Sequence, residues 1–324
     1  MDVDMPTATE PVHTGVQTDI SGRDGVYQLF SINRLDTEAI HHYTGLSCRS
    51  KFDMVLSSLG PARFNLEYYY STNPPISIND QFLLTLIKLR THPPNVELAI
   101  NFGINQKQVS NIFITWINFM YFQWKEVNWW PDQQTVKFYS PSGFKASFPN
   151  TRILLDGTEC PVQKPSRPTA QQSTFSTYKN RNTIKVIVGA TPGGLVSYVS
   201  DAYGGSASDC QIVERSDLQS QVDWGDELMV DKGFICDDLF IPLGVTINIP
   251  TFFKKKNRMS GDTVRNDRKI ASKRVHIERI IGLAKTYKIL TQPMCPLETS
   301  LATQIVTVCF YLCNFRKCIV SKTA

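Results

Sequence analysis

The spacing of apolar residues changes near residue 131, and this change limits the folds available to the chain. Between residues 47 and 130 apolar side chains recur at the period of helices that bury one face. After Trp129-Trp130-Pro131 the pattern becomes short β-branched runs separated by glycine and proline, as in strands joined by turns. A helical period returns from about residue 267. We therefore expect an α+β fold, with a helical domain over residues 46–130 and a sheet-based domain over residues 145–324.

Charge is distributed unevenly along the chain. The whole sequence carries a net charge of +5, but residues 1–45 hold seven acidic and two basic residues. That acidic stretch has little hydrophobic period, so we expect a loosely ordered N-terminal arm. Residues 250–289 hold twelve basic and three acidic residues, which favours a polyanion such as nucleic acid as a partner. A solvated face or a nuclear-import signal is the alternative. The basic residues expected to neutralise DNA phosphates are Lys254, Lys255, Lys256, Arg258, Lys273 and Arg274.

A glycine at position 103 separates two predicted helices of the helical domain. Residues 95–102 precede it, and a longer helix is expected from Gln106 to about Trp124. Ser77 is suited to cap the buried helix before them. Two helices joined by a short turn with glycine are typical of a helix-turn-helix, here within about residues 77–124; an ordinary helical hairpin is the alternative. The residues that would face a DNA groove are Gln106, Lys107, Ser110 and Asn111.

Two apolar strands of the second domain lead into aspartates, Asp156 and Asp231. If these strands are neighbours, the two carboxylates meet at one edge of the sheet, where carboxylate oxygens suit Mg²⁺. Glu278 is the candidate third ligand, because it is the only acid after Asp267 on a basic predicted helix. Two such ions can activate water and stabilise the leaving oxygen of a phosphodiester.

Each of these acids also has an ordinary structural interpretation. Asp156 and Gly157 can form a turn, and Glu278 can pair with Arg274 or Lys285 along one helix. The combination of the three acids with a basic segment and a helix-turn-helix favours metal ligands.

The cysteines and the hydropathy do not indicate disulfides, zinc sites or membrane segments. The eight cysteines include no C-x-x-C pair, and Cys309, Cys313 and Cys318 fall in an apolar stretch. We expect these three to be reduced, buried thiols of a C-terminal helix. No window approaches the roughly 18–20 apolar residues of a membrane span, and the first 22 residues do not resemble a signal peptide, so an intracellular protein is expected.

Four strings around the acids resemble a known family as an ordered set. They are LLDGTEC at 154–160, YKNRNTIK at 178–185, VDKGF at 230–234 and HIERIIG at 276–282. They resemble the DDE superfamily endonuclease domain of eukaryotic transposases of the PIF/Harbinger-like and IS4/IS5-like type. Residues 81–90 and 98–105 resemble the helix-turn-helix that accompanies this domain. The resemblance covers about residues 46–319.

The resemblance implies an RNase H-like catalytic domain, a mixed sheet flanked by helices. It implies that Asp156, Asp231 and Glu278 are catalytic and hold Mg²⁺ or Mn²⁺, as two ions, for hydrolysis and strand transfer on duplex DNA. A nuclear location, a homo-oligomer on transposon ends or genomic target DNA, and no membrane association follow from the same likeness. The zinc-binding Cys/His pattern of some relatives is absent from residues 1–45, which leaves room for an accessory DNA-binding protein.

Two other functions stay open at this point. A domesticated DNA-binding protein would keep the fold without transposition activity, although three clustered acids that repel phosphate argue against this use. An RNase H-like ribonuclease is a further alternative, which the helix-turn-helix disfavours because that motif suits duplex DNA.

Overall fold

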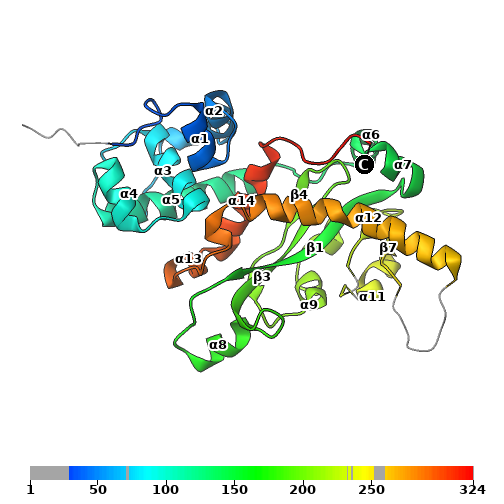
Figure 1. The fold of residues 1–324 in the computed structure, drawn as a ribbon. Coiled ribbons are helices and arrows are strands. Elements are labelled where there is room, and N and C mark those ends of the chain that lie inside the picture. The colour runs from blue at the N-terminus through cyan, green and yellow to red at the C-terminus, as the bar shows by residue number, and fades with distance from the viewer. Residues whose placement is uncertain (1–28, 71–72, 232, 235, 252–259, 324) are drawn as a thin grey trace, which may run out of the picture.

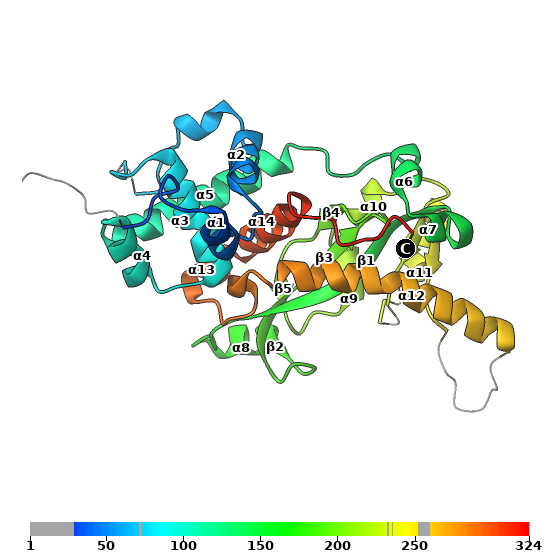
Figure 2. The same cartoon turned by 45° about the horizontal axis from the view of Figure 1, so that its top comes forward.

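The protein divides into a helical part and a sheet part that lie at opposite ends of the molecule (Figures 1 and 2). The computed structural model describes residues 29–70, 73–231, 233–234, 236–251 and 260–323. In chain order the helical part contains α1 (Thr37–Thr44), α2 (Arg49–Ser58), the 3₁₀ helix η1 (Pro61–Phe64), α3 (Ile78–Thr91), α4 (Asn95–Phe102) and α5 (Gln106–Lys125).

Helix α1 lies inside the stretch that was expected to be a loosely ordered arm. Asp36 caps it by accepting the backbone N–H of Ala39 at 2.8 Å, and Ile40 is buried. Ile32 is buried as well, and its backbone N–H donates to Asp80 at 2.9 Å. The predicted boundary at residue 45 is therefore wrong for residues 29–45, where an acidic composition concealed two core side chains.

The predicted caps of the later helices are confirmed. Ser77 Oγ accepts the N–H of Asp80 at the start of α3, and Gly103 ends α4 in the left-handed region with φ of 63°. Glycine adopts that conformation without strain, so α5 can begin three residues later at Gln106.

The sheet is mixed, in the order β2-β3-β1-β6-β7, with β4 and β5 also paired to β3. β1 runs antiparallel to β3 and parallel to β6, and β6 runs parallel to β7. The strands are β1 (Thr151–Pro161), β2 (Phe175–Ser176), β3 (Arg181–Ala190), β4 (Val196–Val199), β5 (Tyr203–Gly204), β6 (Glu227–Met229) and β7 (Thr246–Asn248).

Helices flank this sheet, as the α+β, RNase H-like prediction required. α12 (Gly261–Ala284) crosses one face and contacts β1 and β3 (Figure 1). It begins six residues before its predicted start, because Ser260 Oγ caps it by accepting the N–H of Thr263. The other helices of this part are α6 (Gln133–Tyr139), α7 (Ser142–Ser147), α8 (Pro168–Thr174), α9 (Asp209–Glu214), α10 (Leu218–Gln221), α11 (Asp237–Phe240), η2 (Ile241–Leu243), η3 (Lys288–Leu290), α13 (Pro296–Ser300) and α14 (Ala302–Asn314).

One hydrophobic core extends from the helical part to the α12 and α14 side of the sheet. α5 packs along α14, where the rings of Trp124 and Phe315 stack with centroids 5.7 Å apart. A second core fills the other face, so β1 directs Leu154 into the first core and Ile153 and Leu155 into the second. The two parts of the chain therefore share buried apolar contacts instead of being joined only by a linker.

The cysteines of the last helix follow the prediction in part. Cys309 and Cys313 are buried in α14, whereas Cys318 is exposed because the helix ends four residues earlier, at Asn314. Within the described ranges, no helix combines the length and the apolar character needed to cross a membrane.

Candidate active site

Asp156 lies within β1 and not at its end. The strand was expected to stop at this residue, but it continues to Pro161, with Asp156 opposite Val188 of β3. Gly157 does not form the alternative turn, since it pairs with β3 as well. A Cβ at Gly157 would lie 2.7 Å from Asp209 Oδ1, so glycine here allows α9 to approach the strand closely.

Asp231 reaches the same region because β1 and β6 are parallel neighbours, which meets the condition set for the two carboxylates to lie together. Their register places Leu154 opposite Met229. Asp156 lies two residues after Leu154, and Asp231 lies two residues after Met229. Asp231 lies just beyond β6, and the N–H of Phe234 donates to its backbone carbonyl at 3.0 Å. Its side chain is 49% exposed, which leaves the carboxylate accessible from solvent.

The third acid comes from α12. Arg274 and Glu278 lie one turn apart on this helix, and Arg274 Nη1 forms an ion pair with Asp231 Oδ1 at 2.9 Å. The other guanidinium nitrogen, Nη2, lies 3.9 Å from Glu278 Oε1. The predicted alternative pairing of Glu278 with Arg274 therefore exists, but the shorter contact joins the helix to Asp231.

Arg274 itself was expected to neutralise DNA phosphates, and the structure corrects its placement. Its side chain is only 11% exposed and contacts the acids. Periodicity could have indicated this, because Arg274 falls four residues after the core residue Ile270 and three before Ile277.

The charges of Arg274, Asp231 and Glu278 all affect the pKa of Asp156. Burial is the main reason that the pKa of Asp156 rises to about 6; Arg274 lowers it, and the negative charges of Asp231 and Glu278 raise it further. Such a shift is typical of a mostly buried carboxyl group, and the nearby carboxylates add to it. Because a metal ligand must be ionised, divalent metal affinity at this carboxyl is expected to fall as pH drops below about 6.

The donor chemistry of the three acids fits a hard divalent cation. Mg²⁺ and Mn²⁺ accept oxygen ligands such as the carboxylates of Asp156 in β1, Asp231 just beyond β6, and Glu278 in α12. The positive group between Asp231 and Glu278 is the Arg274 guanidinium. In the part of the chain that the structure describes, no three His, Cys, Asp or Glu side chains are close enough together to hold one ion. Asp156, Asp231 and Glu278 would hold the metal after Arg274 moves.

Replacing Arg274 with Gln is expected to make folding more dependent on divalent metal. Without metal, the variant should lose about 1–2 kcal/mol of stability, because the neighbouring carboxylates repel each other without a cation between them. Millimolar Mg²⁺ should raise its melting temperature more than that of the wild type. Thermal unfolding with and without Mg²⁺ measures both effects, with Arg279→Gln as the control on the exposed side of α12. Equal Mg²⁺ shifts in all three proteins would contradict this role.

Comparison with protein families matches both parts of the chain. Residues 155–314 match the DDE superfamily endonuclease, and residues 74–126 match the helix-turn-helix of DDE superfamily endonuclease. Residues 155–314 form a DDE superfamily endonuclease domain. Members of this superfamily generally use divalent metal ions, and the match includes Asp156, Asp231 and Glu278. No curated protein matches the chain.

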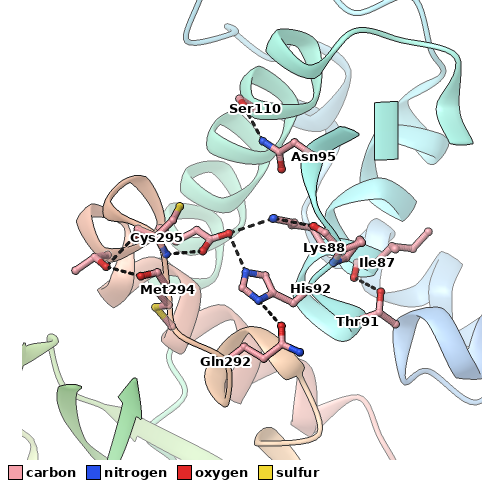
Figure 3. Close-up of polar contacts among 12 residues, drawn as sticks. Ile87, Lys88, Thr91, His92, Asn95, Ser110, Gln292, Met294 and Cys295 are labelled. Atoms are coloured by element: carbon pink, nitrogen blue, oxygen red, sulfur yellow. Dashed lines mark hydrogen bonds and ion pairs between the residues drawn. The ribbon is translucent and has the colours of Figure 1, made fainter. Parts of the chain in front are cut away.

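The helix-turn-helix that accompanies the DDE domain is formed by α4 and α5. Asn105 and Gln108 form a capping box at the start of α5, and Gln106 and Lys107 are exposed beside it, as predicted for groove residues. Ser110 is half-buried and accepts a hydrogen bond from Asn95 of α4 at 3.0 Å (Figure 3). It therefore joins the two helices of the motif.

The prediction that Asn111 faces a DNA groove is wrong. This residue is 1% exposed, and its Oδ1 accepts the backbone N–H of Tyr70 at 2.9 Å. It cannot face a DNA groove from this position, because it lies on the buried side of α5, as do Val109 and Ile112.

The predicted basic contacts lie partly outside the described residues. This applies to Lys254, Lys255, Lys256 and Arg258, which stay predictions. Lys273 is half-buried, with Nζ 5.1 Å from the centroid of the Phe144 ring, and burial lowers its pKa.

A buried polar cluster between the helix-turn-helix part and the DDE domain was not predicted. His92, after α3, has Nε2 2.9 Å from Glu298 of α13 and Nδ1 2.9 Å from Gln292. Figure 3 shows His92 between Lys88 and Gln292. Lys88 Nζ lies 3.2 Å from the same Glu298 oxygen, and the N–H of Cys295 donates to the other oxygen at 2.9 Å. The only sequence signal was the helix end at His92-Pro93-Pro94, which does not identify a partner about 200 residues away.

Proposed function

We propose that this protein is a metal-dependent DNA nuclease of the transposase type, which hydrolyses phosphodiesters and transfers a DNA strand through its 3′-hydroxyl. The observation that supports this best is that Arg274 of α12 forms ion pairs with Asp231, just beyond β6, and with Glu278, and that its charge also lowers the pKa of Asp156 in β1 of the same DDE domain. Stability alone does not explain this arrangement, since the carboxylates of Asp231 and Glu278 are half-exposed and ion pairs to exposed carboxylates contribute little.

The chemistry divides between the metal and the protein. When bound, divalent ions supply an activated water and charge stabilisation at the leaving oxygen. Asp156 supplies a half-buried carboxylate fixed by the strand, and Asp231 and Glu278 supply carboxylates open to solvent and to DNA. α4 and α5 would place the duplex through Gln106 and Lys107.

The proposal is tested by cleavage of supercoiled plasmid DNA. The purified full-length protein should nick the plasmid in Mg²⁺ or Mn²⁺, and EDTA should remove this activity completely. A DNA oligonucleotide with a free 3′-hydroxyl at a transposon end should be joined to the plasmid under the same conditions. Absence of nicking in both metals, with DNA binding intact, would reject the nuclease assignment.

A second candidate is a domesticated DNA-binding protein without transposition activity. The ion pairs of Arg274 favour it specifically, because the guanidinium offsets part of the negative charge that would otherwise repel phosphate in the absence of a metal. This alternative predicts tight DNA binding in EDTA and no cleavage in either metal.

Position in the cell and assembly are further parts of the proposal. We place the protein in the nucleus, as a homo-oligomer on transposon ends or genomic target DNA, with an accessory DNA-binding protein where end recognition requires one. Light scattering of the protein with and without duplex DNA tests the oligomer, and microscopy of the tagged protein tests the location.

The two exposed residues at the start of α5 should have separable effects on DNA binding. Lys107→Ala should weaken binding to all sequences and reduce the salt dependence by about one phosphate contact, whereas Gln106→Ala should change sequence preference. Lys125→Ala is the matched control, because this exposed lysine ends the same helix. Selection of bound sequences from a random library, with titrations at several salt concentrations, measures both. Unchanged preference in Gln106→Ala would refute the groove placement.

A further inference from the structure

A second basic surface lies in the segment between β1 and β3. Residues 161–182 contain four basic residues and no acidic residue. All four side chains are exposed, and within the described part of the chain none of them forms an ion pair. They are Lys164, Arg167, Lys179 and Arg181.

An aromatic ring projects from the centre of this surface. Tyr178, in the turn between β2 and β3, is 83% exposed, and Lys179 Nζ lies 4.6 Å from its ring centroid. Trp224 is almost as exposed, but its ring covers the backbone at Gly244, where a Cβ would come within 2.1 Å of it. Tyr178 has no comparable structural role. An exposed ring beside cations can pack against the sugars or base edges of a duplex while the cations contact phosphates.

The turn that carries Tyr178 is held in a defined shape. Ser176 Oγ accepts the N–H of Lys179 at 3.2 Å, and Asn180 adopts the left-handed region with φ of 50°. Asn182 donates to the carbonyl of Gln171 in α8 at 2.9 Å, so the turn and α8 form one unit. A surface fixed before binding loses less conformational entropy when a ligand binds.

An open groove runs beside the turn and suits a nucleic acid backbone. Its volume is about 860 Å³, and Lys164, Phe175, Asn180 and Arg181 contribute to its lining. The nearest acid of β1 in sequence is Glu159, and its carboxylate accepts a hydrogen bond from Thr183 at 2.8 Å.

The strand register measures how far this surface lies from the acids. Asp156 is opposite Val188 of β3, and Arg181 lies seven residues before Val188 on the same strand. At a rise of about 3.3 Å per residue, the separation is about 23 Å. B-DNA rises about 3.4 Å per base pair, so this distance corresponds to about 7 base pairs. In Figure 1, α8 and the first turns of α12 lie at opposite ends of the sheet.

We propose that the β2–β3 turn with Lys164 and Arg167, the "basic turn", binds the duplex about 7 base pairs from the phosphodiester that the DDE domain cleaves. Lys179 and Arg181 contact phosphates there, and Tyr178 packs against the sugar or base edges of the groove. This inference rests on the proposed function for the position of the cut, but not for the binding itself.

The binding experiment uses full-length protein that carries Asp231→Asn, so that cleavage does not interfere. Lys179→Gln with Arg181→Gln should weaken binding to a 30-base-pair duplex about tenfold and lower the salt slope by about two. Tyr178→Ala should weaken it severalfold, and Tyr178→Phe should bind normally. The matched control is Lys137→Gln with Tyr139→Ala on α6, an exposed lysine and aromatic ring at the far end of the sheet. Affinities of the basic-turn variants equal to that of the control would overturn the inference.

A footprint tests the distance separately. Hydroxyl-radical footprints of the parent protein and the Lys179/Arg181 double variant, on a duplex whose cut site has been mapped, should differ about 7 base pairs from that site. A difference only at the cut site would overturn the proposed position. If the wild-type protein cleaves no DNA but the basic-turn variants still lose affinity, the binding surface stands and the nuclease assignment fails. If the parent protein binds no duplex DNA, the basic turn has no such role.

Discussion

Replacing Asp231 with Asn is expected to reduce DNA cleavage about a thousandfold or more, which corresponds to about 4 kcal/mol of transition-state stabilisation. Asn keeps one oxygen but loses the negative charge that a divalent cation needs. Because Asp231 is half-exposed beyond the end of β6, the substitution should leave the fold unchanged. Initial nicking rates at saturating Mg²⁺ measure the effect, and circular dichroism checks the fold.

A matched control separates this effect from a general change of charge. Asp238→Asn removes an exposed carboxylate in α11 of the same segment and should retain wild-type activity. Cleavage by Asp231→Asn at the rate of Asp238→Asn would remove Asp231 from the active site.

Replacing Glu298 with Gln is expected to lower the free energy of unfolding by about 3 kcal/mol at neutral pH. Burial by itself raises the pKa of Glu298, but the hydrogen bond from His92, the Lys88 ammonium and the N–H of Cys295 together hold it at about 2. The ordinary value is 4.5, and a difference of this size between folded and unfolded states corresponds to about 3 kcal/mol. Gln also leaves the buried Lys88 without its anion.

The pH dependence of this effect has a definite sign. A folded pKa below the unfolded value gives a stabilisation that is fully present above about pH 4.5 and is lost as pH falls towards 2. The stability difference between wild type and Glu298→Gln should therefore be largest at pH 7 and smaller at pH 3. Urea unfolding at both pH values measures it, with Glu97→Gln on the exposed side of α4 as a control within about 0.5 kcal/mol of wild type. A difference independent of pH would contradict the charge argument.

Helix caps and turns were predicted well from the sequence because each depends on only a few neighbouring residues. The cap at Ser77 and the turn at Gly103 were predicted correctly, since both act within one helical turn. The two apolar runs before Asp156 and Asp231 were also identified, but their parallel pairing was only a condition of the metal-site argument and came from the structure.

The incorrect predictions depended on contacts between distant segments. Asp156 seemed to end a strand because Gly157 resembles a turn residue, whereas pairing with β3 carries the strand through it. Arg274 and Asn111 were assigned to DNA by residue type, but packing against the acids and the backbone of Tyr70 buries them. Asp231 and Tyr70 are distant in sequence from these residues, so no local pattern could identify them as partners, although the helical period does place Arg274 on the buried side of α12.

The packing of α5 along α14 affects the spacing between the DNA sequence that α5 would recognise and the bond that the acids would cleave. Because this contact belongs to one continuous core, the start of α5 and the acids of the sheet are held in one rigid frame. For a duplex bound at the start of α5 and at the acids, the dimensions of the protein then fix the number of base pairs between the recognised sequence and the cleaved bond. Inserting about 5 base pairs, half a helical turn, would rotate the scissile bond to the far side of the duplex.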